Sequence, residues 1–247
     1  MTVDRRAELA EALDRVEARL AAACAAAGRT REEVRLLAVT KTFPASDAAL
    51  LAELGMTDLA ENKDQEAASK TREVAGLLSA DRARALRWHM VGRLQRNKAR
   101  SVARWADEVQ SVDSGRLATA LATATRAALD AGERERPLDV LVQVSLDADP
   151  ARGGCPIGEL PALAESITQM GGLLHLRGLM AVAPLGADPG PAFERLAVVA
   201  ERLRADYPEA DRLSAGMSGD LEQAVAHGST CVRVGTALLG GRGLASF

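Results

Sequence analysis

The chain has 247 residues, of which 47% are hydrophobic, and this is enough for one large α/β domain with a full core. Its net charge of −3 and aromatic content of 2% argue against a nucleic-acid partner, because they supply neither a basic field nor stacking platforms. No apolar run reaches the roughly 18 residues of a membrane helix, and the charged N-terminus lacks the apolar core of a signal peptide, so we expect a cytoplasmic protein without membrane contact.

The first part of the chain predicts a helix. From Val3 to about Ala27 apolar residues recur at helical spacing, and Gly28 is typical of a helix end. Short apolar segments then alternate with helical patterns, which is typical of βαβ units and a parallel sheet. The eight expected strands are 36–40, 57–61, 87–92, 107–112, 138–144, 174–180, 211–216 and 231–235. The helices between them are expected at 45–54, 65–75, 95–105, 114–131, 157–170, 191–206 and 219–227.

Eight such units predict one (β/α)8 barrel, a TIM barrel, over residues 1–247. Residues 1–28 form an extra helix that we expect to cover the barrel or its rim. No linker or low-complexity segment divides the chain. A doubly wound open sheet is the alternative fold, because short strands are easily misassigned.

The cysteines and histidines do not predict a disulfide framework or a metal site. They are few, far apart in the sequence and without a CxxC pair. They are Cys24, Cys155, Cys231, His89, His175 and His227.

Lysine is rare in this chain, which has only four lysines among its 31 basic residues. Arginine neither loses its proton nor forms an imine, whereas lysine does both, so each lysine marks a candidate for chemistry. Lys41 directly follows the first apolar strand, LLAVT, and barrels of this class place their functional groups at the C-terminal ends of strands. From position alone, a lysine with its amine in solvent is the more ordinary interpretation.

Two glycine-rich turns follow the last two strands. They are SAGMSGD, residues 214–220, and RVGTALLGG, residues 233–241. Many barrels hold phosphate in these two loops, through backbone amides and hydroxyl groups. Either turn taken singly is equally well explained as an ordinary tight turn.

Together, a lysine after strand one, an arginine in strand eight and a phosphate cradle suit pyridoxal 5′-phosphate (PLP). Strands one and eight are neighbours in a closed barrel. The PLP aldehyde would form an imine with a neutral Lys41, the phosphate would lie on the glycine turns, and Arg233 would face the ring nitrogen. The alternative for Arg233 is an ion pair with a core carboxylate such as Asp113.

The order and content of the motifs resemble the PLP homeostasis protein family. The motifs are VTKTFP, ENKDQE, WHMVGRLQRNK, QSVDS, VQVS, RGLMAVAP and the run from Leu213 to Arg242. The resemblance implies a single fold-type III barrel, like the N-terminal domain of alanine racemase. It also implies PLP held as a Schiff base on Lys41, a role in intracellular PLP (vitamin B6) homeostasis and delivery, and no catalytic turnover.

Carried over to this chain, Lys41 is the imine lysine, Arg233 contacts the pyridine nitrogen and Asn62 lies in the motif that faces the ring. The residues that match the phosphate-binding turns are Ser214, Met217, Ser218, Gly235 and Thr236. The resemblance implies no catalytic residue and no metal. The chain departs from the family, which often has Gly, Asn and Lys, at Ala60, Ser145 and Arg152. The roles of Arg152 and Lys98 stay open.

A PLP-dependent amino-acid racemase is the alternative function. A two-base racemase needs a proton-transfer group on each face of the cofactor, and the one tyrosine, Tyr207, lies at an expected helix end beside Pro208. A lysine-dependent aldolase is a third hypothesis, although its lysine usually ends a later strand than that of Lys41. For the carrier we expect apo PLP-dependent enzymes as recipients, and a monomer.

Overall fold

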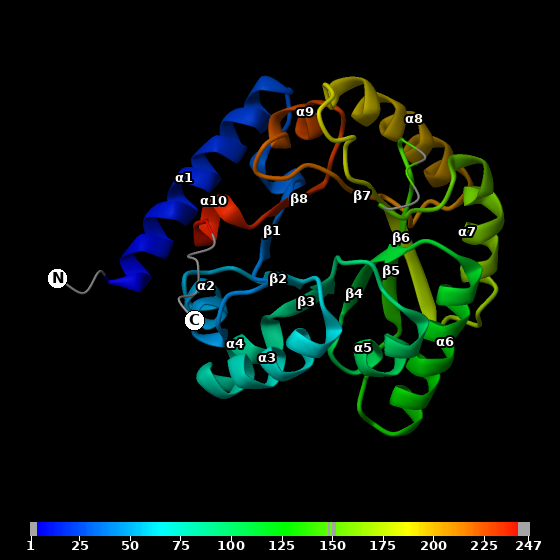
Figure 1. Cartoon of the computed structure of the whole chain (residues 1–247), viewed down its shortest axis with the longest axis horizontal. Coiled ribbons are helices and arrows are strands. Elements are labelled where there is room, and N and C mark those ends of the chain that lie inside the picture. Colours follow the sequence, from blue (N-terminus) through cyan, green and yellow to red (C-terminus); the bar gives the residue numbers. More distant parts are fainter. Residues whose placement is uncertain (1–3, 148, 150–151, 242–247) are drawn as a thin grey trace.

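The eight parallel strands close into a barrel with helices around it (Figure 1). The structure, a computed structural model, describes residues 4–147, 149 and 152–241, so the first three and last six residues of the predicted domain lie outside it. In ring order the strands are β1 (Arg35–Val39), β2 (Asp58–Glu61), β3 (Arg87–Met90), β4 (Glu108–Val112), β5 (Leu138–Gln143), β6 (Leu174–Met180), β7 (Arg212–Ser214) and β8 (Cys231–Val234). β1 pairs with both β2 and β8, so the predicted TIM barrel is confirmed and the open sheet is wrong.

The helices lie outside the strands and connect them. They are α1 (Arg5–Ala26), α2 (Ala45–Glu53), α3 (Asp64–Leu77), α4 (Ala80–Ala85), α5 (Ala99–Trp105), α6 (Gly115–Asp130), α7 (Leu160–Thr168), α8 (Gly190–Asp206), α9 (Leu221–Ala226) and α10 (Thr236–Leu239). Two of them, α4 and α10, are not predicted from the sequence. The ADRARA stretch of α4 buries no residue and so carries no periodic signal, and α10 is one turn inside a glycine-rich run.

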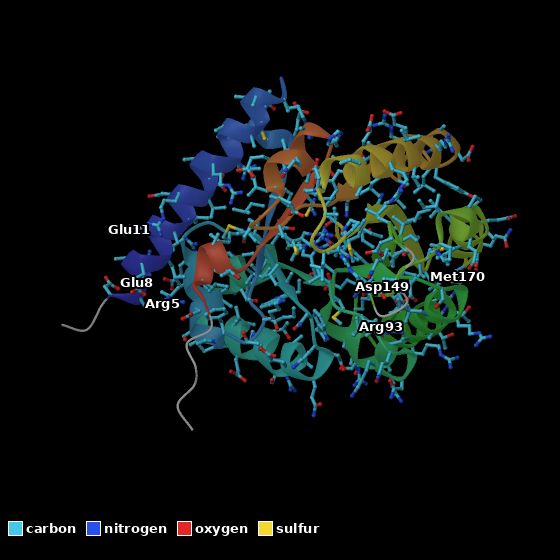
Figure 2. All side chains as sticks on the ribbon, turned by 45° about the horizontal axis from the view of Figure 1, so that its top comes forward. Arg5, Glu8, Glu11, Arg93, Asp149 and Met170 are labelled. Atoms are coloured by element: carbon cyan, nitrogen blue, oxygen red, sulfur yellow. The ribbon has the colours of Figure 1, made fainter. Side chains whose placement is uncertain are left out.

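Helix α1 packs along α9 and α10 at the side of the barrel (Figure 1). Arg19 donates to the carbonyl of Ser218, and Arg5 donates to the carbonyl of Leu239. Figure 2 shows Arg5 at the start of α1, on the side facing α10. The extra helix therefore touches the loops after β7 and β8. Its buried apolar face includes Leu9, Leu13, Val16 and Leu20.

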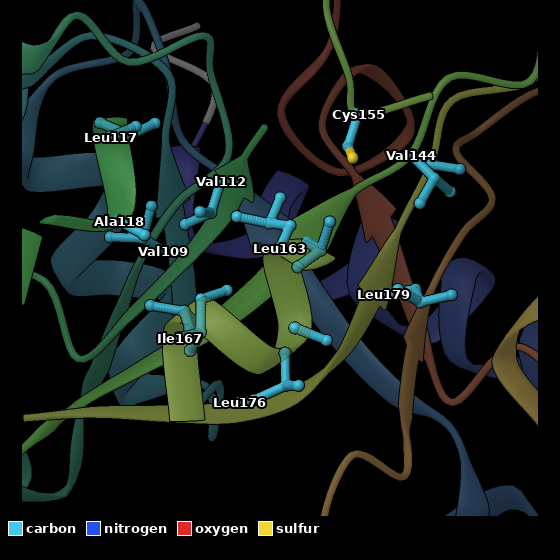
Figure 3. Packing of buried hydrophobic residues seen from close by; sticks show 14 of the residues in the cluster. Val109, Val112, Leu117, Ala118, Val144, Cys155, Leu163, Ile167, Leu176 and Leu179 are labelled. Carbon is cyan, nitrogen blue, oxygen red and sulfur yellow. The ribbon is translucent and has the colours of Figure 1, made fainter. Parts of the chain in front are cut away.

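The apolar core lies between the strands and the helices. Figure 3 shows Leu163 and Ile167 of α7, which belong to the same buried cluster as Val109 and Val112 of β4. Burial of each such side chain contributes roughly 1.5–3 kcal/mol to folding. Among the described residues, no helix is long and apolar enough to cross a membrane.

The inside of the barrel is unusually polar for this fold, whose interior is normally filled by branched apolar side chains. His89, Glu108, Gln110 and Ser214 are all buried and hydrogen-bonded to one another or to nearby charges. A small apolar cluster built around Leu37 and Cys231 is also buried here. The polar interior extends from Glu108, at the start of β4, to Ser214, at the end of β7.

Candidate functional site

A cavity of about 460 Å³ opens at the C-terminal ends of the strands. Its lining comes from the ends of β1, β2, β3, β6 and β8 and from the turns after β7 and β8. Seven of the eight residues predicted for cofactor binding line it. They are Lys41, Asn62, Met217, Ser218, Arg233, Gly235 and Thr236.

Lys41 begins a turn whose backbone is unusual. The next residue, Thr42, has φ +68°, a left-handed conformation that β-branched residues rarely adopt. Its N–H donates to Glu66 Oε1 at 2.7 Å, and the N–H of Phe43 donates to the Thr40 carbonyl at 3.1 Å. These bonds hold the turn, so Lys41 stands on a fixed backbone rather than on a frayed strand end.

A second lysine, Lys70 of α3, lies beneath this turn. Its buried Nζ donates to Glu61 Oε1 at 2.6 Å, to the Thr40 carbonyl at 2.9 Å and to Glu66 Oε1 at 3.0 Å. Burial raises the pKa of Glu61, although Lys70 and Thr40 act in the opposite direction. Glu61 is therefore bonded to Lys70 and to Thr40 at the end of β1, and it does not line the cavity.

Arg233 reaches the cavity from β8 and is 5% exposed. It donates to the carbonyl and the Oγ of Ser214, both at 2.8 Å, and to the carbonyl of Ala181 at 2.8 Å. Burial lowers its pKa from the ordinary value, yet a guanidinium stays charged at neutral pH. Its hydrogen-bond partners among the described residues are neutral, so the alternative of an ion pair with Asp113 is wrong.

Ser214 is the one predicted cofactor residue that does not line the cavity. It is fully buried in β7, where its Oγ accepts from Arg233 and donates to Gln110 Oε1 at 2.7 Å. The structure therefore places Ser214 behind Arg233, below the glycine turn that begins two residues later.

The turns after β7 and β8 present free amides. The N–H groups of Ser218, Gly219 and Thr236 have no hydrogen-bond partner within the described part of the chain. The N–H of Met217 is taken by Asp220 Oδ1 at 2.6 Å. Because all three free amides belong to residues that line the cavity, this end of it suits an anionic group.

The chemistry of the lining fits PLP. Among the described residues, the charged side chains of the lining are those of Lys41 and Arg233, so this lining attracts an anion and contains no competing carboxylate. Asn62 Oδ1 is buried and has no hydrogen-bond partner among the described residues, which leaves an acceptor for a polar ligand. A Cβ on Gly219 would meet no atom within 4 Å, so the backbone there has open space beside it.

Two basic residues whose roles were open lie outside this cavity. Arg152 pairs with Asp147 at 2.6 Å and donates to the Ala183 carbonyl at 2.6 Å, so its guanidinium is already engaged. Lys98 is partly exposed and lines neither this cavity nor a larger groove of about 1250 Å³ beside it. That groove is formed by the segments around Arg93, Arg116 and Glu159 and contains none of the predicted cofactor residues.

His89 lies between two carboxylates inside the barrel. Its Nε2 lies 2.8 Å from Asp58 and its Nδ1 lies 3.0 Å from Glu108. Burial acts to lower the pKa of His89, but the two carboxylates outweigh it and raise the pKa above the ordinary value. Within the described ranges, no group of three or more His, Cys, Asp or Glu residues is arranged to hold a metal ion.

Residues 12–243 match the sequence model of the family described as alanine racemase, N-terminal domain, a range that includes every residue of the cavity. The pyridoxal phosphate homeostasis protein of Mycobacterium tuberculosis is 51% identical over 249 residues, which cover 98% of this chain and 96% of the relative. A solved structure from Bifidobacterium adolescentis has a TM-score of 0.86 and 32% identity, covering 96% of this chain and 97% of that chain. PipY of Synechococcus elongatus, solved with PLP bound, has a TM-score of 0.75 and 32% identity, covering 94% and 100%.

Proposed function

We propose that this chain, which belongs to the pyridoxal phosphate homeostasis protein family, binds PLP as a Schiff base on Lys41 and holds it for delivery, without catalytic turnover. One observation carries the proposal. Lys41 and Arg233 share a cavity whose lining has no carboxylate and whose turns present free amides.

Each group in the cavity has a role in this proposal. Lys41 would hold PLP through its Nζ, whose amine chemistry suits an aldehyde. The free amides of Ser218, Gly219 and Thr236 would bind the phosphate, and Asn62 and Arg233 would contact the ring. Bound PLP supplies an electron sink, and this sink is weak when its ring nitrogen faces a permanent cation such as Arg233.

The lining also favours a carrier over a racemase. A two-base racemase needs a second proton-transfer group opposite Lys41. The described lining holds no Tyr, His, Cys, Asp or Glu side chain. Tyr207 follows α8 and packs against the outer core. These features support binding without turnover, and the names of the relatives agree with it.

The proposal includes transfer of PLP to apo PLP-dependent enzymes. The cavity opens at the C-terminal ends of the barrel strands, and this position supports the transfer because a cofactor bound there lies at the mouth of the barrel. A monomeric state and a cytoplasmic location stay predictions from the sequence.

Borohydride reduction followed by peptide mapping tests the proposal. The purified protein incubated with PLP is reduced, digested and analysed by mass spectrometry, and the label is expected on Lys41. Lys41→Ala should lose the label and the yellow colour, whereas Lys63→Ala, a change of an exposed lysine, should keep both. A label absent from the wild type would overturn the proposal. Racemisation of amino acids, followed by chiral chromatography, would favour the alternative.

A further inference from the structure

We propose that Gln110 is a positioning residue for Arg233, acting through a buried chain of hydrogen bonds that runs from the cavity into the barrel. The chain is Arg233, Ser214, Gln110 and Glu108. The inference deepens the proposed function and rests on it, because the group that Gln110 orients is the one proposed to contact the PLP ring.

The direction of the first two bonds follows from the chemistry of arginine. A guanidinium has donors and no acceptor, so Arg233 must donate to Ser214 Oγ, 2.8 Å away. The serine hydroxyl proton is then free to point elsewhere. It points to Gln110 Oε1, which lies 2.7 Å from Ser214 Oγ.

The same reasoning fixes both ends of the Gln110 amide. Because Oε1 accepts from Ser214, the NH2 group faces the opposite way. There Nε2 donates to Glu108 Oε1 at 2.8 Å. If the amide were flipped, its Nε2 would face the hydroxyl proton of Ser214 and its Oε1 would face a carboxylate oxygen of Glu108. Both contacts would be repulsive, so only one amide orientation satisfies both neighbours.

Glu108 is a firm anchor for the chain because it is held as a carboxylate. Arg212 donates to its Oε2 and His89 lies 3.0 Å from its Oε1. Burial acts to raise the pKa of Glu108, but His89 and Arg212 outweigh it and hold the pKa well below the ordinary value. A carboxylate accepts only, so every donor in the chain points from the cavity toward Glu108.

This chain is shielded from bulk water. Ser214 and Gln110 are 0% exposed and Glu108 is 1% exposed. Removal of the Gln110 amide would leave the Ser214 hydroxyl without its acceptor, so the Ser214 side chain would be free to rotate about χ1 and carry Oγ away from Arg233 toward another carbonyl. Arg233 would then lose one of its three fixed acceptors, and its guanidinium would be less well oriented in the cavity.

A double-mutant cycle on PLP affinity tests the inference. Gln110→Met keeps the length and volume of the side chain and removes its polar atoms, and Ser214→Ala removes the relay hydroxyl. Each should weaken PLP binding about tenfold, as for loss of a hydrogen bond to a charged group. The double variant should also lose about tenfold, because both changes break one chain. Thr125→Val, a buried polar-to-apolar change on α6 away from the chain, should leave affinity unchanged.

Two outcomes would overturn the inference. One is Gln110→Met binding PLP as tightly as the wild type. The other is a double variant about a hundredfold weaker than the wild type, which would mean that the two residues act independently. If the wild type and Thr125→Val themselves fail to bind PLP, the proposed function fails instead, so the two failures are distinguishable.

A second measurement needs no PLP. In the unliganded protein, NMR should show slow hydrogen exchange for the side-chain NH2 of Gln110 and for the guanidinium of Arg233. Ser214→Ala should speed exchange at Arg233 while the fold, followed by the backbone amides, is kept. Unchanged exchange at Arg233 in this variant would contradict the positioning role even if Gln110→Met does not fold.

Discussion

The backbone N–H of Thr42 donates to Glu66 Oε1 across 2.7 Å, and this bond fastens the turn after Lys41 to helix α3. The same oxygen accepts from Lys70 Nζ at 3.0 Å. A left-handed threonine costs of order 1–3 kcal/mol and persists only where its surroundings hold it. The position of the proposed imine lysine therefore depends on the side chain of Glu66, which lies 24 residues after Thr42.

We expect Glu66→Ala to reduce the amount of PLP that borohydride fixes on Lys41 at limiting PLP. The change removes the acceptor for the Thr42 amide, so the turn samples other conformations and Lys41 is less well placed. Glu66→Gln keeps a carbonyl oxygen at this position and should retain most of the labelling. Equal labelling of the alanine and glutamine variants would show that the turn does not need Glu66.

Lys70→Met should destabilise the protein by about 3–5 kcal/mol, because it leaves Glu61 buried without its cation. Urea unfolding followed by circular dichroism measures this. Glu61→Gln in the Lys70→Met background removes the uncompensated charge and should recover part of the loss. If Lys70→Met alone is as stable as the wild type, the buried pair contributes nothing to folding.

The order of strands and helices was predictable because short segments with apolar residues alternate along the chain with helical patterns. Strand boundaries agree with the structure to within a few residues, as for Leu138–Gln143 against the expected 138–144. The two unpredicted helices have no periodic pattern to detect. Closure of the ring could only be inferred from the count of eight, and the pairing of β1 with β8 establishes it.

Residues of the candidate site could be predicted where the residue type itself indicates chemistry. They could not be predicted where the role depends on which residues the fold brings together. Lys41 stood out in an arginine-biased chain, and the same signal pointed to Lys70, whose partners could not be read from the sequence. Gln110 carried no signal, because its role depends on Ser214 lying across the barrel on a strand 104 residues away. Ser214 was predicted from its motif to bind phosphate, and the structure places it behind Arg233 instead.

Gly92→Ala should weaken PLP binding and lower stability by about 1–3 kcal/mol. A Cβ at this position would lie 2.1 Å from the backbone oxygen of Asn62, so the end of β2 must move. Gly76→Ala is the control, because a Cβ there meets no atom within 4 Å, and in helix α3 it should stabilise by up to about 1 kcal/mol. Unfolding curves measure the stability of both variants, and PLP titrations measure their affinity. Tight PLP binding by Gly92→Ala would show that Asn62 tolerates displacement.

The free energy of unfolding should fall as the pH rises above 6.5, the ordinary pKa of histidine. The pKa of His89 is raised in the folded state, so between 6.5 and that higher value the folded protein binds a proton that the unfolded chain has released. The stabilisation is complete below 6.5 and is lost as the pH passes the folded pKa. Its cause is the position of His89 between Asp58 and Glu108, 2.8 Å and 3.0 Å away.

At acid pH the free energy of unfolding should fall as the pH decreases, because the pKa values of Asp58 and Glu108 are lowered by folding. Their stabilisation is present above the ordinary values of 3.8 and 4.5 and is lost as the pH falls through the lower folded values. Urea unfolding of the wild type from about pH 3 to 9 should therefore give maximal stability near pH 5 to 6. His89→Gln cannot take up the proton, so the difference between wild type and variant should shrink as the pH rises. A difference that stays constant from pH 6 to 9 would mean that folding does not raise the pKa of His89.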